Sequence, residues 1–216
     1  LPFGLCNAPS TFTRLMDKVL RKLVGKSCLV YLDDVVTFGK TFEEALGNLR
    51  IVFGRFREAG LTLKPSKCTL FQKEVSFLGH FVSADGVRCD PAKIEKVHAW
   101  TAPKCVKDVK SFLGLASYYR RFIKGFATIA NPLTALTKKE NKFIWSEKCQ
   151  LAFDELKELL TNAPILVQPL NEGKYILDTD ASNFGLGGVL SQVRPDGSEK
   201  VIGYASRTLS PAQRNY

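Results

Sequence analysis

Two adjacent carboxylates in an apolar stretch constrain this chain more than any other feature. Asp33 and Asp34 stand between two mainly apolar runs, residues 28–32 and 35–38. Neighbouring acids inside an apolar strand would repel each other and lose hydration, which is costly unless cations or hydrogen bonds neutralise them. A tight β-hairpin turn avoids this cost, because both carboxylates then project at one end of the sheet. We therefore expect Asp33-Asp34 to form the bend of a hairpin whose arms are residues 29–32 and 35–38.

A hairpin end with two carboxylates suits a hard divalent cation. Mg²⁺ takes carboxylate oxygens together with water and substrate phosphates. An ordinary Asp-Asp turn that holds no metal would contain the same two residues. The pair alone leaves both interpretations open.

Composition and charge indicate a globular protein with an anionic partner. The 216 residues are 45% hydrophobic and 11% aromatic, which supports the buried cores of one large or two small domains. The net charge of +10 and the pI of about 9.4 favour a nucleic-acid partner or a membrane surface. No apolar run approaches the ~20 residues of a membrane span, so we expect nucleic acid and no membrane. The six scattered cysteines indicate reduced, intracellular thiols and no zinc site.

Residue spacing predicts an α+β chain. Apolar residues recur at helical intervals in several segments, and other segments alternate as strands do. The expected helices cover residues 10–26, 42–59, 91–98, 106–116 and 147–160. The expected strands cover residues 29–32, 35–38, 61–63, 68–72, 75–83, 174–180, 185–190 and 201–206. Residues 131–141 are the most linker-like stretch, and a loose domain boundary is expected near Ala163-Pro164.

Ordered motifs give the chain a family resemblance over essentially its whole length. They are Leu1-Pro2-Phe3-Gly4, Tyr31-Leu32-Asp33-Asp34, Phe77-Leu78-Gly79-His80, Arg120-Arg121-Phe122-Ile123, Phe143-Ile144-Trp145 and Asp178-Thr179-Asp180-Ala181-Ser182. Together they resemble the reverse transcriptases of long-terminal-repeat retrotransposons of the Ty3/gypsy type, running into the start of a ribonuclease H domain. The implied fold is a right-hand polymerase palm and thumb fragment, followed by the first strands of a ribonuclease H-like domain.

The resemblance assigns roles to individual residues. Asp33 and Asp34 match two of the three catalytic, metal-binding carboxylates of the polymerase, and Asp180 matches a metal-binding carboxylate of the nuclease; Asp178 could instead be an exposed strand residue. Phe3 and Gly4 match the segment beside the incoming nucleotide and template. Phe77, Leu78, Gly79 and His80 match the hairpin that holds the primer end. The implied cofactor is Mg²⁺, with Mn²⁺ as a substitute, in a two-metal nucleotidyl transfer.

The implied domains are a partial palm at residues 1–89, a thumb with connecting helices at 90–163 and a partial ribonuclease H-like domain at 164–216. The family's first polymerase carboxylate precedes the Leu1-Pro2-Phe3-Gly4 motif, and further nuclease acids follow Tyr216. We therefore expect an internal fragment of a polyprotein that is inactive alone. The expected partners are an RNA and DNA template-primer, deoxynucleoside triphosphates and other segments of the Pol polyprotein.

Two other classes remain open on the sequence. A catalytically inactive, transposon-derived nucleic-acid-binding protein would keep the basic surface. An RNA-dependent RNA polymerase shares the palm, although residues 178–182 disfavour it. The expected location is intracellular and cytoplasmic, in a virus-like particle.

Overall fold

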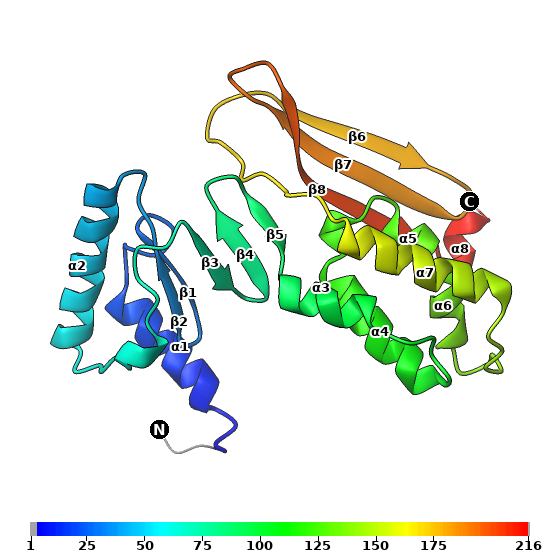
Figure 1. Ribbon diagram of the computed structural model, residues 1–216, viewed down its shortest axis with the longest axis horizontal. Coiled ribbons are helices and arrows are strands. Elements are labelled where there is room, and N and C mark those ends of the chain that lie inside the picture. The colour runs from blue at the N-terminus through cyan, green and yellow to red at the C-terminus, as the bar shows by residue number, and fades with distance from the viewer. Residues whose placement is uncertain (1–3, 216) are drawn as a thin grey trace. The chain divides into compact units, whose positions relative to one another are not determined.

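A computed structural model describes residues 4–215 (Figure 1), so the predicted contact residue Phe3 lies outside the described residues. Helices and strands are mixed along the chain, which confirms the α+β class. The chain divides into two compact units, Leu1–Phe77 and Leu78–Tyr216.

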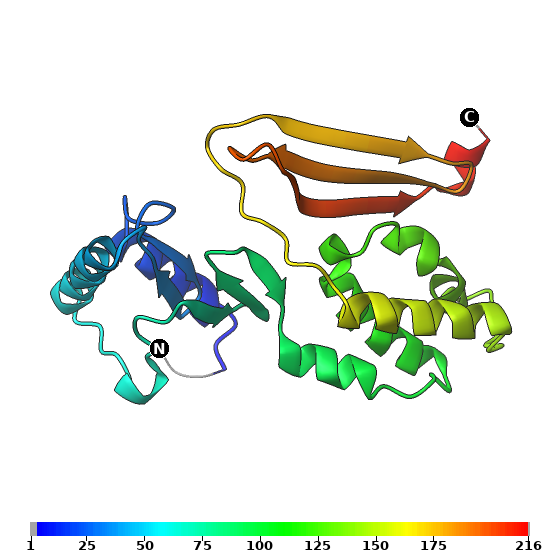
Figure 2. The same cartoon turned by 45° about the horizontal axis from the view of Figure 1, so that its top comes forward.

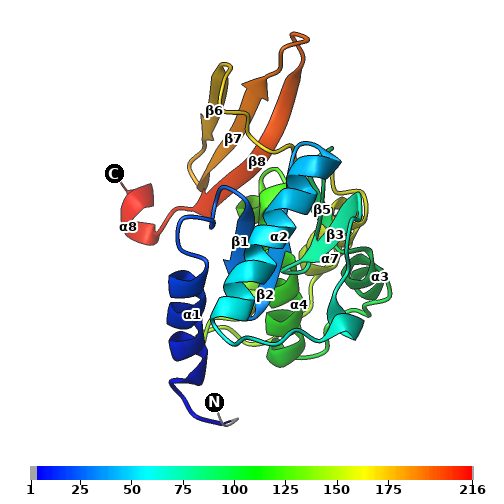
Figure 3. The ribbon, with the colours of Figure 1, turned by 90° about the vertical axis from the view of Figure 1, so that its left-hand side faces the viewer.

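The first unit contains a two-stranded hairpin packed against two helices. Its elements are α1 (Ala8–Val19), β1 (Cys28–Tyr31), β2 (Asp34–Thr37), α2 (Phe42–Glu58), the 3₁₀ helix η1 (Pro65–Lys67) and β3 (Glu74–Phe77). Figure 3 shows α1, the hairpin and α2 next to one another. Their buried side chains form one apolar core, which consists of Met16, Leu20, Cys28, Val52 and Phe56.

The ends of α2 follow from local sequence. Thr41 caps its start, because the hydroxyl oxygen accepts a hydrogen bond from the Glu44 amide at 3.2 Å. The Glu44 carboxylate accepts from the Lys40 amide at 2.8 Å, which satisfies a further donor at this end. At the other end Gly60 has a φ of +67°, and the amides of Gly60 and Leu61 donate back into the last turn. This left-handed glycine stops the helix where the sequence predicted.

α1 is shorter than predicted. It ends at Val19 instead of residue 26, and Lys22 and Gly25 beyond it have φ values of +73° and +79°. A right-handed helix cannot continue through such backbone angles. The helical spacing of apolar residues continues past Val19 because Leu20 is also buried in the core, although the helix has already ended there.

The second unit combines a helical layer with an antiparallel sheet. Its strands are β4 (His80–Ser83), β5 (Val87–Cys89), β6 (Tyr175–Ala181), β7 (Gly185–Val193) and β8 (Glu199–Thr208). Its helices are α3 (Pro91–His98), α4 (Val106–Tyr118), the 3₁₀ helix η2 (Arg120–Phe122), α5 (Phe126–Ile129), α6 (Asn131–Leu136), α7 (Glu147–Thr161) and α8 (Pro211–Arg214). Figure 2 shows β6, β7 and β8 as one layer beside the helices. The contact between this sheet and the helices is made by β8, which packs against α5 and η2.

The core of this unit is built by helices that the sequence only partly predicted. The rings of Phe112 of α4 and Phe153 of α7 pack in a tilted arrangement with 4.6 Å between centroids, and both residues are buried. The stretch 131–141 is not a linker over its whole length, because residues 131–136 form α6. Leu133 and Leu136 of α6 are buried in the core, so packing rather than spacing determines this short helix.

Residues 165–167 connect the two sheets of this unit. The amide of Val87 donates to the Leu166 carbonyl at 2.7 Å, and the Leu166 amide returns a bond to Val87 at 2.9 Å. The next amide, that of Val167, donates to Val201 of β8 at 3.0 Å. Leu166 itself is fully buried. This segment therefore fixes β5 and β8 in one body.

Candidate functional sites

The hairpin that carries Asp33 and Asp34 is confirmed. Tyr31 pairs with Asp34 and Cys28 with Thr37, so β1 and β2 are joined by a two-residue turn of Leu32 and Asp33. The bend is one residue earlier than predicted, and Asp34 is the first residue of β2. Both carboxylate residues are exposed. They therefore lie together at one end of the hairpin, open to solvent.

The turn holds Leu32 in an unfavourable backbone conformation. Its φ is +54°, a region that a branched side chain seldom adopts, and Leu32 is also exposed. A two-residue hairpin needs such an angle at its first central position, where glycine or asparagine is common. A non-glycine residue with this strain is typical of functional turns. The strain therefore agrees with a role for this turn beyond reversing the chain.

Gly4 and Asp180 are the other predicted contact and metal-binding residues in the described range. Gly4 is exposed with a φ of +94°, and a side chain there would meet no atom within 4 Å. Asp180 lies on β6 opposite Gly187, and Asp178 lies opposite Val189 on the same pair of strands. Both aspartates are exposed. Among residues 4–215, no three histidine, cysteine, aspartate or glutamate side chains gather as a metal site.

The predicted primer-contacting residues surround a second tight turn. The expected strand 75–83 is in fact two strands, because Leu78 and Gly79 have φ values of +50° and +67° and reverse the chain between β3 and β4. Phe77 ends β3 in the first unit, and Leu78, Gly79 and His80 belong to the second. The sequence predicted one continuous strand because leucine seldom adopts a positive φ and so gave no sign of the turn. The strands expected at 61–63 and 68–72 are also absent: the 3₁₀ helix η1 lies between these segments, and Phe71 has a φ of +53°, which an extended strand cannot contain.

His80 sits in an aromatic environment. Its ring lies 5.2 Å from that of Tyr118, 5.4 Å from that of Tyr119 and 5.7 Å from that of Phe122, centroid to centroid. Nδ1 lies 2.9 Å from the Leu78 carbonyl oxygen, while buried Nε2 has no hydrogen-bond partner among the described residues. Burial lowers the pKa of His80, and the Arg121 charge lowers it further, against an opposing effect of the Leu78 bond. The neutral ring, with its proton on Nδ1, suits these surroundings.

Two tyrosines at the end of α4 are functional candidates that the sequence analysis missed. The Tyr119 hydroxyl donates to the Gly79 carbonyl at 2.6 Å, and the Tyr118 hydroxyl donates to the Leu78 carbonyl. Tyr119 is only 1% exposed. Burial raises its pKa to about 12, so the hydroxyl stays protonated and remains a donor. A buried tyrosine needs a hydrogen-bond partner, but the sequence gives no sign that the partner lies 40 residues away.

Basic side chains of the helical region are exposed, as a phosphate-binding surface requires. These side chains are those of Lys104, Lys107, Lys110, Arg120, Arg121 and Lys124. Arg121 also has a structural role, because its guanidinium donates to the Ile202 carbonyl at 3.3 Å. The others supply charge that is free to neutralise phosphate without reading sequence.

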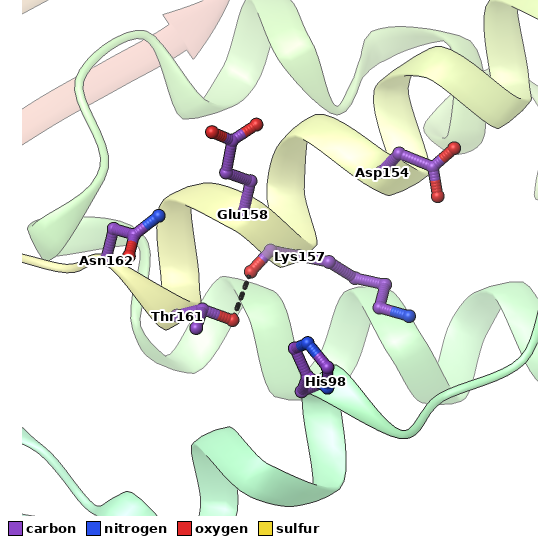
Figure 4. A pocket seen from close by; sticks show the side chains of 6 residues that line it. All are labelled: His98, Asp154, Lys157, Glu158, Thr161 and Asn162. Carbon is purple, nitrogen blue, oxygen red and sulfur yellow. Dashed lines mark hydrogen bonds between the residues drawn. The ribbon is translucent and has the colours of Figure 1, made fainter.

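A shallow hollow of about 290 Å³ lies between α3 and α7 (Figure 4). Its lining residues are His98, Asp154, Lys157, Glu158, Thr161 and Asn162. Lys157 donates to the Trp100 carbonyl at 2.8 Å and its ammonium lies 5.2 Å from the Phe153 ring centre. The lysine therefore holds α7 to the end of α3, and the hollow contains none of the predicted site residues.

Two family models match the chain. Residues 1–82 match "Reverse transcriptase (RNA-dependent DNA polymerase)", and residues 145–216 match "RNase H-like domain found in reverse transcriptase". No helix within residues 4–215 has the length and apolar character needed to cross a lipid bilayer.

Curated relatives match the whole chain. It is 43% identical over 218 residues to the retrovirus-related Pol polyprotein from transposon 297 of Drosophila melanogaster. It is 38% identical over 228 residues to the corresponding polyprotein from transposon gypsy of the same organism. The chain spans 20% and 22% of the length of these two relatives.

Solved structures agree with this sequence similarity. A foamy viral protease-reverse transcriptase in complex with double-stranded DNA is 30% identical, with a TM-score of 0.85 over 99% of this chain and 37% of that one. A second structure of a foamy viral protease-reverse transcriptase, in complex with an RNA/DNA hybrid, is also 30% identical, with a TM-score of 0.82 over 99% of this chain and 29% of that one.

Proposed function

The chain belongs to the retrovirus-related Pol polyproteins of transposons, as a segment with reverse transcriptase sequence followed by ribonuclease H-like sequence; from this we propose that it contributes to RNA-directed DNA synthesis and to cleavage of the RNA strand of a hybrid. The observation that carries the proposal is the Asp33-Asp34 pair at the end of the β1–β2 hairpin. Both residues are exposed, adjacent and held by a strained turn.

The donor set at the hairpin end fits a hard divalent cation. Asp33 and Asp34 offer only carboxylate oxygens, which Mg²⁺ prefers and Mn²⁺ also accepts. When bound, such ions would activate the primer 3′-hydroxyl and stabilise charge on the leaving pyrophosphate. Asp33 and Asp34 would hold the ions, while the rigid hairpin would keep the two carboxylates at a fixed separation. Asp180 on β6 would serve the nuclease site in the same way.

Other residues would hold the substrates. Phe3 and Gly4 would lie beside the incoming deoxynucleoside triphosphate and the template, and Gly4 has room for close approach. Phe77, Leu78, Gly79 and His80 would hold the primer end. The foamy viral enzymes bound to double-stranded DNA and to an RNA/DNA hybrid support a template-primer as partner. Other segments of the polyprotein would complete the assembly.

We assign residues 1–89 to a palm, 90–163 to a thumb with connecting helices and 164–216 to a ribonuclease H-like domain. The reverse transcriptase match over residues 1–82 supports the first assignment. The ribonuclease H-like match begins at residue 145, so it includes α7 as well as the sheet β6–β8. All six cysteines are free thiols, which agrees with the reducing, cytoplasmic location that we propose; the virus-like particle is inferred from the family alone.

The test is a pair of activity assays on a polyprotein segment that includes these 216 residues and flanking sequence. Asp33→Asn and Asp34→Asn should each abolish Mg²⁺-dependent primer extension, because the amide is a weaker metal ligand than the carboxylate. Duplex affinity should change less than about twofold, since phosphate contacts dominate binding. Asp180→Asn should abolish cleavage of the RNA strand in a hybrid and leave extension intact.

Asp17→Asn is the matched control, because Asp17 is an exposed aspartate of α1 with no assigned role. It should leave both activities unchanged. Extension at the normal rate by either hairpin variant would show that the catalytic pair is wrongly assigned. Duplex binding by the unaltered segment with neither activity would support an inactive, transposon-derived binding protein instead.

A further inference from the structure

The turn of Leu78 and Gly79 needs support from outside its own hairpin. Both residues have positive φ, and Leu78 has no glycine-like freedom to relieve the strain. Their carbonyl groups are directed out of the strand pairing, toward the end of α4. A turn in this conformation persists only when its surroundings hold it.

Tyr118 and Tyr119 provide that support through consecutive hydroxyl groups. Tyr118 donates to the Leu78 carbonyl and Tyr119 to the Gly79 carbonyl, the latter at 2.6 Å. Their rings meet edge to face, with 5.1 Å between centroids and 87° between planes. Each tyrosine thus serves one peptide group of the turn, and neither can replace the other.

The tyrosines are themselves fixed by packing. Tyr119 is buried, and its ring lies 6.2 Å from that of buried Phe122. His80 fills the space beside both tyrosines and also approaches the Leu78 carbonyl through Nδ1. Tyr118 is half exposed, so it is held mainly by its hydroxyl bond and by these ring contacts. The turn and the end of α4 therefore form one rigid body.

We propose that Tyr118 and Tyr119 are positioning residues of the polymerase, which fix the Leu78–Gly79 turn to α4 and thereby align the primer end that the turn holds. The inference rests on the proposed primer contact of residues 77–80. Loss of a hydroxyl would let the turn move without removing any group that touches the nucleic acid. The rate of nucleotide addition should then fall while duplex affinity stays nearly constant, because a misaligned 3′-hydroxyl reacts slowly however tightly the duplex is bound.

The test compares Tyr118→Phe, Tyr119→Phe and the double variant in the same polyprotein segment. Under single-turnover conditions with saturating primer-template, each single variant should lower the rate of nucleotide addition about tenfold, and the double variant about a hundredfold. The dissociation constant of the duplex should change less than about twofold. The same preparations should cleave the RNA strand of an RNA/DNA hybrid at the normal rate. This second activity is the control that the variants are folded.

Tyr175→Phe is the matched control. Tyr175 also donates its hydroxyl to a backbone carbonyl, that of Leu170 at 3.0 Å, but on β6. It should leave extension unchanged. An extension rate within twofold of the unaltered protein for all three Tyr118 and Tyr119 variants would overturn the inference. Equal loss of extension and hybrid cleavage would also overturn it, because that pattern means a structural role.

The proposed function fails independently of this inference. Normal primer extension by Asp33→Asn would disprove the assignment of the catalytic pair. The tyrosine variants would still test the positioning role, because their readout is the rate of nucleotide addition itself. If Asp33→Asn is inactive and the tyrosine variants are fully active, the proposed polymerase function stands and only the positioning role of the tyrosines is rejected.

Discussion

Single residues that carry backbone strain or unusual burial lie in the parts of this molecule for which we propose a function. Leu32 and Leu78 both have positive φ, and they occupy the turns that carry the predicted catalytic and primer-contacting residues. Neither leucine signals its conformation in the sequence, because glycine or asparagine is the usual indicator of such a turn. The motifs were recognisable, but the strain that accompanies them was visible only in the structure.

His80 should make folding sensitive to acid. Its folded pKa is lowered by burial, with Arg121 adding to the effect; Tyr118, Tyr119, Phe122 and Cys89 are the other groups around it. As the pH falls below the ordinary histidine value of 6.5, the unfolded chain takes up the proton first. The free energy of unfolding therefore declines as the pH falls from 6.5 toward the lower folded pKa of His80. Below the folded pKa the loss of stability due to His80 is complete.

The measurement is urea unfolding between pH 7.5 and pH 5. We expect His80→Phe, which keeps an aromatic ring, to show a smaller loss of stability on acidification than the unaltered protein. His98→Gln replaces the other histidine, which is exposed on α3, and should keep the original pH dependence. The same acid dependence in His80→Phe would mean that another group is responsible.

At the scale of elements, capping residues predicted where helices start well, whereas the end of α1 and the short packed segments were predicted poorly. Asp90-Pro91 begins α3 as expected, with the Asp90 carboxylate accepting from the Ala92 amide at 2.9 Å. Ser146 likewise caps α7. By contrast α6 is six residues long and depends on burial of Leu133 and Leu136, which spacing over so few residues cannot reveal. Pairings between distant segments, such as Val87 with Leu166, left no local pattern to find.

Gly86 should be intolerant of any side chain. Its φ is +140°, and a Cβ built there would overlap the Leu166 carbonyl oxygen, a backbone atom that is itself hydrogen-bonded to Val87. We expect Gly86→Ala to lower the free energy of unfolding by about 2 to 4 kcal/mol, from clash and backbone strain together. Thermal or denaturant unfolding measures the change.

Gly114→Ala is the control for that substitution. Gly114 lies inside α4 with open space around its Cβ position and an ordinary helical backbone. Alanine there should stabilise the protein by about 0.5 to 1 kcal/mol, because it favours the helix. If both variants were equally stable, the β5 contact with Leu166 would not constrain this turn.

At the scale of the whole molecule, the positive charge is the property that bears most directly on the proposed binding of nucleic acid. A net charge of +10 favours binding to any duplex, and on the proposed function the exposed lysines and arginines around α4 and η2 would contact phosphates and not bases. Composition alone leads to this prediction, and the structure adds that the side chains are exposed. The grouping of α4, α7 and the sheet β6–β8 in one compact unit was not predictable, because it depends on contacts between distant residues.

Duplex binding should weaken steeply with salt and show little sequence preference. If about six phosphates are contacted, affinity should fall roughly a thousandfold between ~50 and ~200 mM salt through counterion release. Fluorescence anisotropy with two unrelated duplex sequences would measure both properties. Affinity that barely changes with salt would exclude phosphate contacts as the main source of binding.

The backbone hydrogen bonds between Leu166 and Val87 determine where a protease could divide this segment without disturbing the structure around β5. A cut at residue 163 that removed everything after it would take away the chain that completes the β5 edge and leave an empty volume where Leu166 was buried. A cut after residue 168 would leave both in place. A polymerase part released by such a cut would therefore retain residues 145–168, which belong by sequence similarity to the ribonuclease H-like domain.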